Sequence, residues 1–224
     1  MEWQAAVREG VYPAAFAAKL TDTTSARVAS WFRTRDKSHL APAIVTPFQP
    51  LAGQLVMPFL ALVEARFVAR FRTHGLSLQT IRKVAKKLRH KHSLDHPFAT
   101  ERRFRTDGKR IMMEEAADDG ERRLLDLMTD EWAFPDVVEP SLFASVVYVD
   151  DLAVRMKPFP EFSSIIIDPR LALGRPVVDP GYVPTDTLAA AYLAEGDVEA
   201  VADWYGTTPA AVTQALGFEQ RLAA

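Results

Sequence analysis

The stretch VYPAAFAAKLTDTTSARVASWFRTR, residues 11–35, predicts two short helices separated by the turn TDTT. Each helix has an apolar stripe at helical spacing, formed by Phe16, Ala17 and Leu20 in the first and by Val28, Trp31 and Phe32 in the second. The opposite face of the second helix carries Arg27, Ser30 and Arg33. This stretch therefore predicts a helix pair with one buried face and one polar, basic face.

The turn between the two helices also supplies a cap. Thr23 or Thr24 can accept a backbone N–H at the start of the second helix. Two short helices with small residues at their crossing and a basic outer face on the second are typical of a helix-turn-helix. An ordinary αα-hairpin packed in a core is the alternative that this stretch leaves open.

The next segment predicts a wing. Ile44–Val45 and Leu55–Val56 are short β-prone runs separated by two prolines and a glycine. This spacing favours a small two-stranded element, which the prolines confine to a sheet edge.

Two longer helices follow the expected wing. Apolar residues at every fourth position from Phe59 to Phe71 predict a buried helix that ends at Gly75. Ser77 then caps a helix with an apolar stripe and a basic face, the latter made of Arg82, Lys83, Lys86, Lys87, Arg89 and Lys91. We expect a winged-helix domain over residues 1–92.

The remainder of the chain predicts two further modules. Residues 93–160 contain three hairpin-turn signals, at 106–108, 118–120 and 150–151, and are expected to form a small antiparallel β module. Residues 161–224 are expected to form a three-helix module, with helices over 187–194, 198–205 and 210–218. The predicted fold class is α+β, mainly α.

The caps and core of the three-helix module can be read from local chemistry. Asp197 is expected to cap the second helix, and Pro209 to occupy the first turn of the third. The expected shared core consists of Leu188, Tyr192, Val198, Val201, Ala202, Trp204, Val212, Leu216 and Phe218.

Composition excludes several classes of protein. The 224 residues are 48% hydrophobic and 25% charged and contain no cysteine, so disulfides and thiolate metal sites are excluded. No apolar run approaches the roughly 18–20 residues of a membrane span, and no signal peptide opens the sequence. We therefore expect a cytoplasmic protein with no membrane association.

Charge is distributed unevenly along the sequence. Residues 1–110 contain 20 Lys and Arg and 8 Asp and Glu, a net charge of +12, whereas residues 111–224 have a net charge of −14. The first half is therefore suited to a polyanion partner and the second to a different task. A solvated basic face without a ligand remains the alternative for the first half.

Two parts of the sequence resemble known families. AAKLTDTTSARVASWF, followed by FLALVEARFVARFRTHGLSLQTIRKV, is similar to the MerR-type winged-helix head, although Asp22 stands where that family usually has a turn glycine. From residue 165, IIIDPRLALGRPVVDPGYVPTDTLAAAYLAEGDVEAVADWYGTTPAAVTQALGFE resembles a bacterial family of unknown function. Members of that family are encoded beside PIN-type ribonuclease toxins and act as their antitoxins. Together the two parts resemble a VapB-type antitoxin.

No catalytic constellation is found. The sequence has no nucleophile elbow, P-loop, dinucleotide-binding fingerprint or H-E-x-x-H motif. His90, His92 and His96 have donor atoms for zinc, but a polar helix end is the favoured interpretation. We therefore expect no enzyme activity, no cofactor and no metal.

The basic residues are better suited to DNA. Arg27, Ser30 and Arg33 are expected to meet base edges in a major groove, since arginine can grip guanine with two hydrogen bonds. Neighbouring cations are expected to hold backbone phosphates. The full set of candidate DNA-contacting residues is Lys19, Thr24, Ser25, Arg27, Ser30, Arg33, Arg35, Lys37, Arg82, Lys83 and Lys86.

These observations lead to one main functional hypothesis. The sequence predicts an antitoxin of a type II toxin–antitoxin pair that represses its own operator and neutralises a PIN-type ribonuclease toxin. A homodimer is expected because helix-turn-helix proteins usually read two half-sites, with the three-helix module as the first choice of contact and the β module as the second. A MerR-like regulator that senses a small molecule is one alternative, with Phe143, Tyr148, Phe159 and Phe162 as pocket candidates that more often form core. An interaction module without nucleic acid is another.

Overall fold

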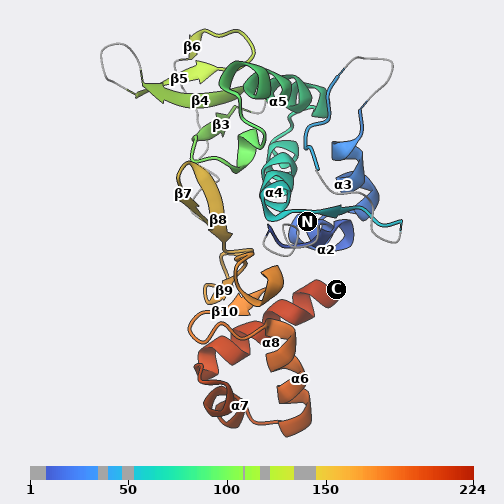
Figure 1. Cartoon of the computed structure of the whole chain (residues 1–224), viewed down its shortest axis with the longest axis vertical. Helices are drawn as coiled ribbons and strands as arrows, with labels where there is room; N and C mark the ends of the chain where they lie inside the picture. The colour runs from blue at the N-terminus through green and yellow to red at the C-terminus, as the bar shows by residue number, and fades with distance from the viewer. Residues whose placement is uncertain (1–8, 35–39, 47–52, 108, 117–121, 134–144) are drawn as a thin grey trace. The chain divides into compact units, whose positions relative to one another are not determined.

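The computed structural model describes residues 9–34, 40–46, 53–107, 109–116, 122–133 and 145–224 (Figure 1). The chain divides into two compact units. The N-terminal unit comprises Pro13–Ala144 and Tyr148–Ala153, and the C-terminal unit comprises Met1–Tyr12, Ser145–Val147 and Val154–Ala224. Both contain helices and small antiparallel sheets, so the fold is α+β. The division into three domains at residues 92 and 160 stays a prediction.

The four helices predicted for the N-terminal unit are present. They are α2 (Ala14–Leu20), α3 (Ser25–Phe32), α4 (Phe59–Thr73) and α5 (Leu78–His92). The Thr24 side chain accepts a hydrogen bond from the Arg27 N–H, and the Ser77 side chain accepts one from the Thr80 N–H, so both predicted caps are confirmed.

Aromatic side chains form the centre of this unit. Phe98, in the short 3-10 helix η1 (Pro97–Ala99), lies edge-on to Phe71 of α4 and to Phe104, with ring centroids 5.4 Å apart in both pairs. Trp31 of α3 is also buried, at 2% exposure. The apolar stripes predicted for α3 and α4 therefore face the core.

A buried carboxylate lies in the same core. The Glu64 side chain on α4 is fully buried, its Oε1 accepts the backbone N–H of Phe98 at 3.3 Å, and its Oε2 lies 3.1 Å from Nδ1 of His96. These contacts tie η1 to α4 and give the polar oxygens of a side chain removed from water their hydrogen-bond partners. His96 is therefore a partner of Glu64 and belongs to the core of the fold.

The predicted wing is wrong in part. Ile44 and Val45 form no strand, and only the second β-prone run does, as β2 (Val56–Met57). Instead, the Ala14 N–H donates to the Leu55 carbonyl at 2.9 Å, which places this run beside the start of α2. Local β-propensity is present in both runs, but it does not choose the pairing partner.

The predicted β module contains a four-stranded antiparallel sheet. Its strands are β3 (Phe104–Thr106), β4 (Ile111–Ala116), β5 (Arg122–Asp126) and β6 (Trp132–Ala133), in that order. Phe104 pairs with Met113, Met113 with Leu125, and Leu125 with Trp132, so four large apolar residues form one row across the sheet. The second predicted hairpin turn, at 118–120, falls outside the described residues.

Short strands lead into the C-terminal unit. The third predicted hairpin is present as β7 (Val146–Val149) and β8 (Leu152–Met156), whose residues are divided between the two units, as are those of β1 (Tyr12–Pro13). In the C-terminal unit, β9 (Ile165–Ile166) pairs with β10 (Val177–Val178), and the 3-10 helix η3 (Ala172–Gly174) lies between them in sequence.

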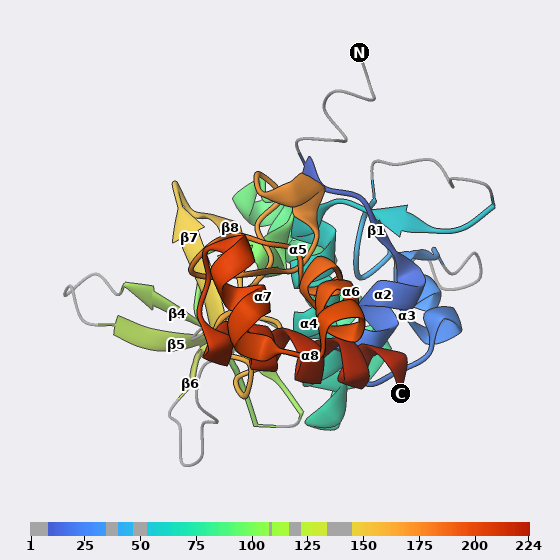
Figure 2. The same cartoon turned by 90° about the horizontal axis from the view of Figure 1, so that it is seen from below.

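The three predicted C-terminal helices are confirmed. They are α6 (Thr185–Glu195), α7 (Val198–Tyr205) and α8 (Pro209–Ala223), and Figure 2 shows them packed together. The Asp197 carboxylate caps α7 by accepting the Ala200 N–H at 3.0 Å. The predicted core is wrong at Trp204, whose side chain is 64% exposed, and Tyr192, Val198 and Leu216 are only half-buried.

Candidate nucleic-acid interface

Helix α3 separates its apolar and basic residues onto two faces. Val28 and Trp31 are buried, whereas Arg27 and Arg33 are exposed to solvent. The Ser30 side chain is half-buried, and its Oγ donates to the Arg27 carbonyl at 2.6 Å. The helix therefore presents two arginines from a firmly anchored backbone.

The turn before α3 takes a conformation that suits a helix pair. Asp22 has a φ of 48°, in the left-handed region that glycine and short polar residues tolerate best. The Thr23 N–H donates to the Ala18 carbonyl at 3.0 Å, which closes the end of α2. Asp22 therefore takes a turn conformation that glycine adopts more readily than other residues. Lys19, Thr24 and Ser25 lie exposed on either side of this turn.

Two arginines on the inner face of α5 hold α3 and the segment after it. Arg82 is 4% exposed, and its Nη2 donates to the carbonyl oxygens of Ser30 at 2.8 Å and Arg33 at 3.2 Å. Arg89, seven residues later, donates from Nη1 to the Pro42 carbonyl at 2.9 Å and from Nη2 to the Ala43 carbonyl at 2.8 Å. Burial lowers the pKa of Arg89, against the raising influence of nearby carboxylates. The two arginines thus connect α5 to the polypeptide on both sides of residues 35–39.

The sequence contains a signal that Arg82 and Arg89 point inward. Arg82 lies four residues after Leu78, and Arg89 lies four residues after Ala85, so both fall on the apolar stripe of α5. The interpretation of the sequence instead places both arginines on the basic face of this helix, together with the lysines. The structure gives Arg82 a role in positioning α3, while its contact with DNA stays a prediction.

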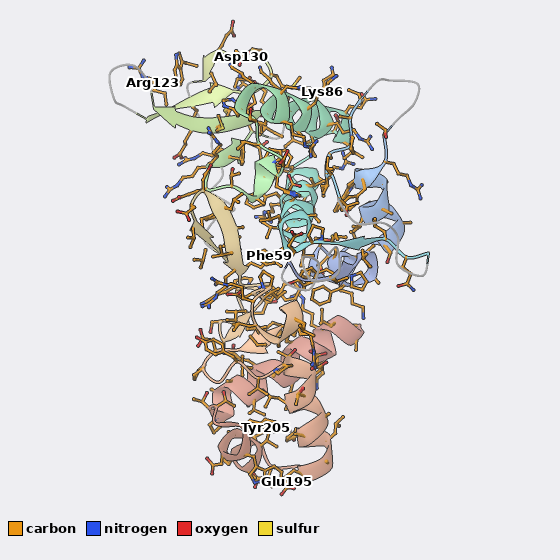
Figure 3. The ribbon with its side chains drawn as sticks, in the orientation of Figure 1. Phe59, Lys86, Arg123, Asp130, Glu195 and Tyr205 are labelled. Carbon is orange, nitrogen blue, oxygen red and sulfur yellow. The ribbon has the colours of Figure 1, made fainter. Side chains whose placement is uncertain are left out.

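The outer face of α5 carries the remaining predicted cations. Lys83 and Lys86 are exposed, and Figure 3 labels Lys86 on this helix. Lys87 and Lys91 differ, because their Nζ atoms lie 2.6 and 3.0 Å from the carboxylate of Asp130. These two ion pairs lower the pKa of Asp130 and join α5 to the turn between β5 and β6. Lys83 and Lys86 are therefore better placed for an external anion than Lys87 and Lys91.

A surface pocket of about 370 Å³ lies between α3 and the start of α5. It is lined by Ser30, Arg72, Ser77, Leu78, Gln79 and Arg82. One wall thus carries the exposed Arg72, and another carries the first turn of α5, where backbone N–H groups and the helix dipole favour anions. The pocket therefore brings Arg72 and the first turn of α5 close to Ser30 of α3.

Some predicted positions do not enter this picture. Arg35 and Lys37 lie outside the described residues, as does Phe143 of the small-molecule alternative. Phe159 and Phe162 pack against Phe218 of α8 with ring centroids 6.0 and 5.8 Å away, so they belong to a core cluster. Tyr148 is half-buried in the N-terminal unit, where burial, together with the Glu101 charge, raises its pKa.

Two further properties concern the described part of the chain alone. Within it, no group of three or more His, Asp or Glu side chains is arranged to hold a metal ion. None of its helices is both long enough and apolar enough to span a bilayer.

Comparison with known proteins finds a distant relative that is named as an antitoxin. No protein-family model matches the chain. It is similar to a protein of Mycobacterium tuberculosis (strain ATCC 25618 / H37Rv) named "Putative antitoxin VapB45", with 28% identity over 185 residues, 78% of this chain and 76% of that protein. This distant relative supports the resemblance to a VapB-type antitoxin.

A particular solved structure has the same fold. The crystal structure of Rv2018 from Mycobacterium tuberculosis matches with a TM-score of 0.63 and 23% sequence identity, over 92% of this chain and 96% of that chain. At this identity the match shows a shared fold of helices and small sheets.

Proposed function

We propose that this chain is the antitoxin of a type II toxin–antitoxin pair, which binds its own operator DNA as a repressor and neutralises a PIN-type ribonuclease toxin. The observation that carries the DNA-binding part is the exposure of Arg27 and Arg33 on a helix whose other face is buried through Trp31. Such a helix can enter a major groove and present guanidinium groups to guanine edges. The relative named as an antitoxin supports the toxin-binding part.

The basic surroundings of α3 supply the sequence-independent part of binding. Lys19, Lys83, Lys86 and Arg72 are exposed in the same unit. Each cation that neutralises a phosphate releases counterions, so affinity falls as salt rises. In this proposal α3 reads the sequence and the surrounding cations hold the backbone.

We further propose a homodimer. Two copies of α3 related by a two-fold axis would read half-sites about one helical turn apart, which one copy cannot do. The mass of the free protein and of its DNA complex, measured by light scattering after size-exclusion chromatography, tests this. A single copy bound per operator would contradict it.

One experiment tests both activities. The chain is titrated against duplex DNA from upstream of its own gene, with and without the product of the adjacent gene, which this proposal expects to be the ribonuclease, in an electrophoretic shift assay. RNA cleavage by that ribonuclease is measured in parallel. We expect a salt-sensitive shift and loss of cleavage at equimolar chain. No preference for the upstream DNA over scrambled DNA would contradict repression, and undiminished cleavage would contradict neutralisation.

A further inference from the structure

Three exposed aromatic residues of the C-terminal unit lie outside its core. Trp204 and Tyr205, at the end of α7, are 64% and 37% exposed. Tyr182 is 46% exposed and belongs to a neighbouring turn, because the Thr207 Oγ1 donates to the Pro180 carbonyl at 2.7 Å. Each of the three residues stands within three positions of Pro180 or Thr207, which this hydrogen bond joins, and we call the three the aromatic patch.

The backbone beneath the patch is firmly held without it. Helix α7 is anchored by the buried Val201 and Ala202. It begins at the Asp197 cap and ends at Gly206, which has a φ of 62°, and the Thr207 N–H donates to the Ala202 carbonyl at 3.0 Å. The aromatic patch is therefore presented in a fixed place, and packing of α7 does not explain why a tryptophan stands at its end.

The segment that carries Trp204 and Tyr205 has charge of one sign. Residues 187–220 contain five Asp and Glu and no Lys, Arg or His. Glu199 and Asp203 are exposed on α7 itself, and Glu195 ends α6. None of these three carboxylates has an ion-pair partner within the described residues. Figure 3 labels Glu195 and Tyr205 at the same end of the C-terminal unit.

This charge selects the kind of partner. A nucleic acid would bring phosphates against the carboxylates, which is unfavourable. A second copy docked through the same patch would oppose like charges. A protein surface with an apolar hollow would accept the aromatic side chains. A Lys- and Arg-rich margin around that hollow would attract the carboxylates. A ribonuclease has such cations, because it must bind RNA phosphates.

We propose that Trp204, Tyr205 and Tyr182 are the anchors, and Glu199 and Asp203 the acidic rim, of a docking surface for a cationic protein. The inference rests on the proposed function, in which that protein is the ribonuclease. The aromatic side chains insert into the apolar hollow of the partner and are desolvated there, as hot-spot residues of protein interfaces are. The carboxylates remain near solvent and speed association more than they slow dissociation. Two-fold contact between copies is then left to the second predicted choice, the β module.

The test measures binding of the full-length chain to the purified ribonuclease of the proposed function, the expected product of the adjacent gene, by biolayer interferometry. Trp204→Ala is expected to weaken binding roughly thirtyfold or more, mainly through faster dissociation, the loss typical of a hot-spot aromatic. Leu173→Ala is the matched control, because Leu173 is an exposed apolar residue of the same unit at 68% exposure, outside α6–α8. It should bind within about twofold of wild type.

Charge reversal provides the second arm. Glu199→Lys is expected to slow association at low salt with little change in dissociation, whereas Glu131→Lys in the N-terminal unit should have little effect. Circular dichroism and operator binding confirm that each variant is folded.

The outcomes separate the two proposals. If wild type binds the ribonuclease and Trp204→Ala binds it equally well, the docking surface is wrong and the proposed function stands. If wild type binds no ribonuclease while it shifts its operator, toxin neutralisation is wrong and the docking proposal falls with it. If Trp204→Ala halves the mass of the free protein, the patch joins two copies and the proposal is also wrong.

Discussion

The Arg82 guanidinium donates a hydrogen bond from Nη2 to the carbonyl oxygen of Ser30 at 2.8 Å. It thereby connects the second turn of α5 to the last turn of α3, which carries Arg27 and is followed by Arg33 at its C-cap. A charged donor that neutralises carbonyls at a helix C-terminus also complements the helix dipole. Arg82 is therefore expected to govern where α3 lies.

The first prediction concerns this contact. Arg82→Ala should lower the free energy of unfolding by about 1.5–3 kcal/mol, because it removes buried hydrogen bonds from a charged group. It should also weaken operator binding, because Arg82 acts through α3. The slope of log K against log salt should change by less than the loss of one phosphate contact would produce. Urea denaturation and DNA titrations at several salt concentrations measure both effects.

Lys83→Ala is the matched control for Arg82→Ala. It removes an exposed cation from the adjacent position of α5. It should leave the unfolding free energy within about 0.5 kcal/mol of wild type. Equal stability of the two variants would show that the Arg82 contacts contribute nothing to the fold.

The second prediction concerns the outer face of α5. Lys83→Ala combined with Lys86→Ala should weaken binding to all duplex sequences alike and should reduce the slope of log K against log salt by about 2. Lys87→Ala should change the slope less, because its Nζ lies 2.6 Å from an Asp130 carboxylate oxygen. A double variant with an unchanged slope would exclude this face from the DNA contact.

The third prediction concerns the buried carboxylate of α4. Glu64→Ala should destabilise the N-terminal unit by about 3 kcal/mol, because it leaves the Phe98 N–H and the His96 ring without their acceptor. Glu131→Ala, which removes an exposed carboxylate from the same unit, serves as the control. Thermal unfolding followed by circular dichroism provides the readout. Coincident transitions of the two variants would contradict this prediction.

The fourth prediction is a pH dependence of the C-terminal unit. Burial by itself raises the pKa of the Asp168 carboxyl, but hydrogen bonds from Arg170 and Arg155 outweigh it and lower the pKa overall. The Arg170 Nη2 and Arg155 Nε donate to the Asp168 Oδ2 at 2.7 and 3.3 Å. A carboxyl whose pKa is lowered in the folded state stabilises above its unfolded pKa of about 3.9. That stabilisation is lost as pH falls through the folded-state value.

Asp168→Asn is therefore expected to lower stability at pH 7 by about 1–3 kcal/mol and to show less further loss than wild type between pH 4 and pH 2. The control is Asp150→Asn, in an exposed hairpin turn. Urea midpoints across this pH range measure the difference. Parallel pH curves for wild type and Asp168→Asn would contradict the assignment.

Local chemistry made much of this fold predictable. Thr24, Ser77 and Asp197 cap helices where the sequence places them, since a cap depends only on residues three positions apart. The pairing of β strands depends on distant partners, so Ile44–Val45 was expected to be a strand and is not, and β6 was not foreseen.

Trp204 shows the limit for the candidate sites. Hydrophobic spacing assigned it to the core of the three-helix module, whereas the structure leaves it largely exposed. A pattern of apolar residues does not distinguish a side chain that packs within the chain from one that awaits a partner. The direction of Arg82 was missed for a related reason, because a long cationic side chain on an apolar stripe can reach inward to carbonyls.

Operator binding by the Arg27→Ala, Arg33→Ala double variant tests most directly whether α3 reads the operator. The control replaces two exposed cations outside α3 and α5, Arg103 and Lys109, with alanine. We expect the first variant to lose about a hundredfold or more of its affinity for the upstream DNA and to retain ribonuclease binding, while the control loses far less. If the Arg27→Ala, Arg33→Ala variant shifts that DNA as wild type does, α3 is not the helix that reads the operator.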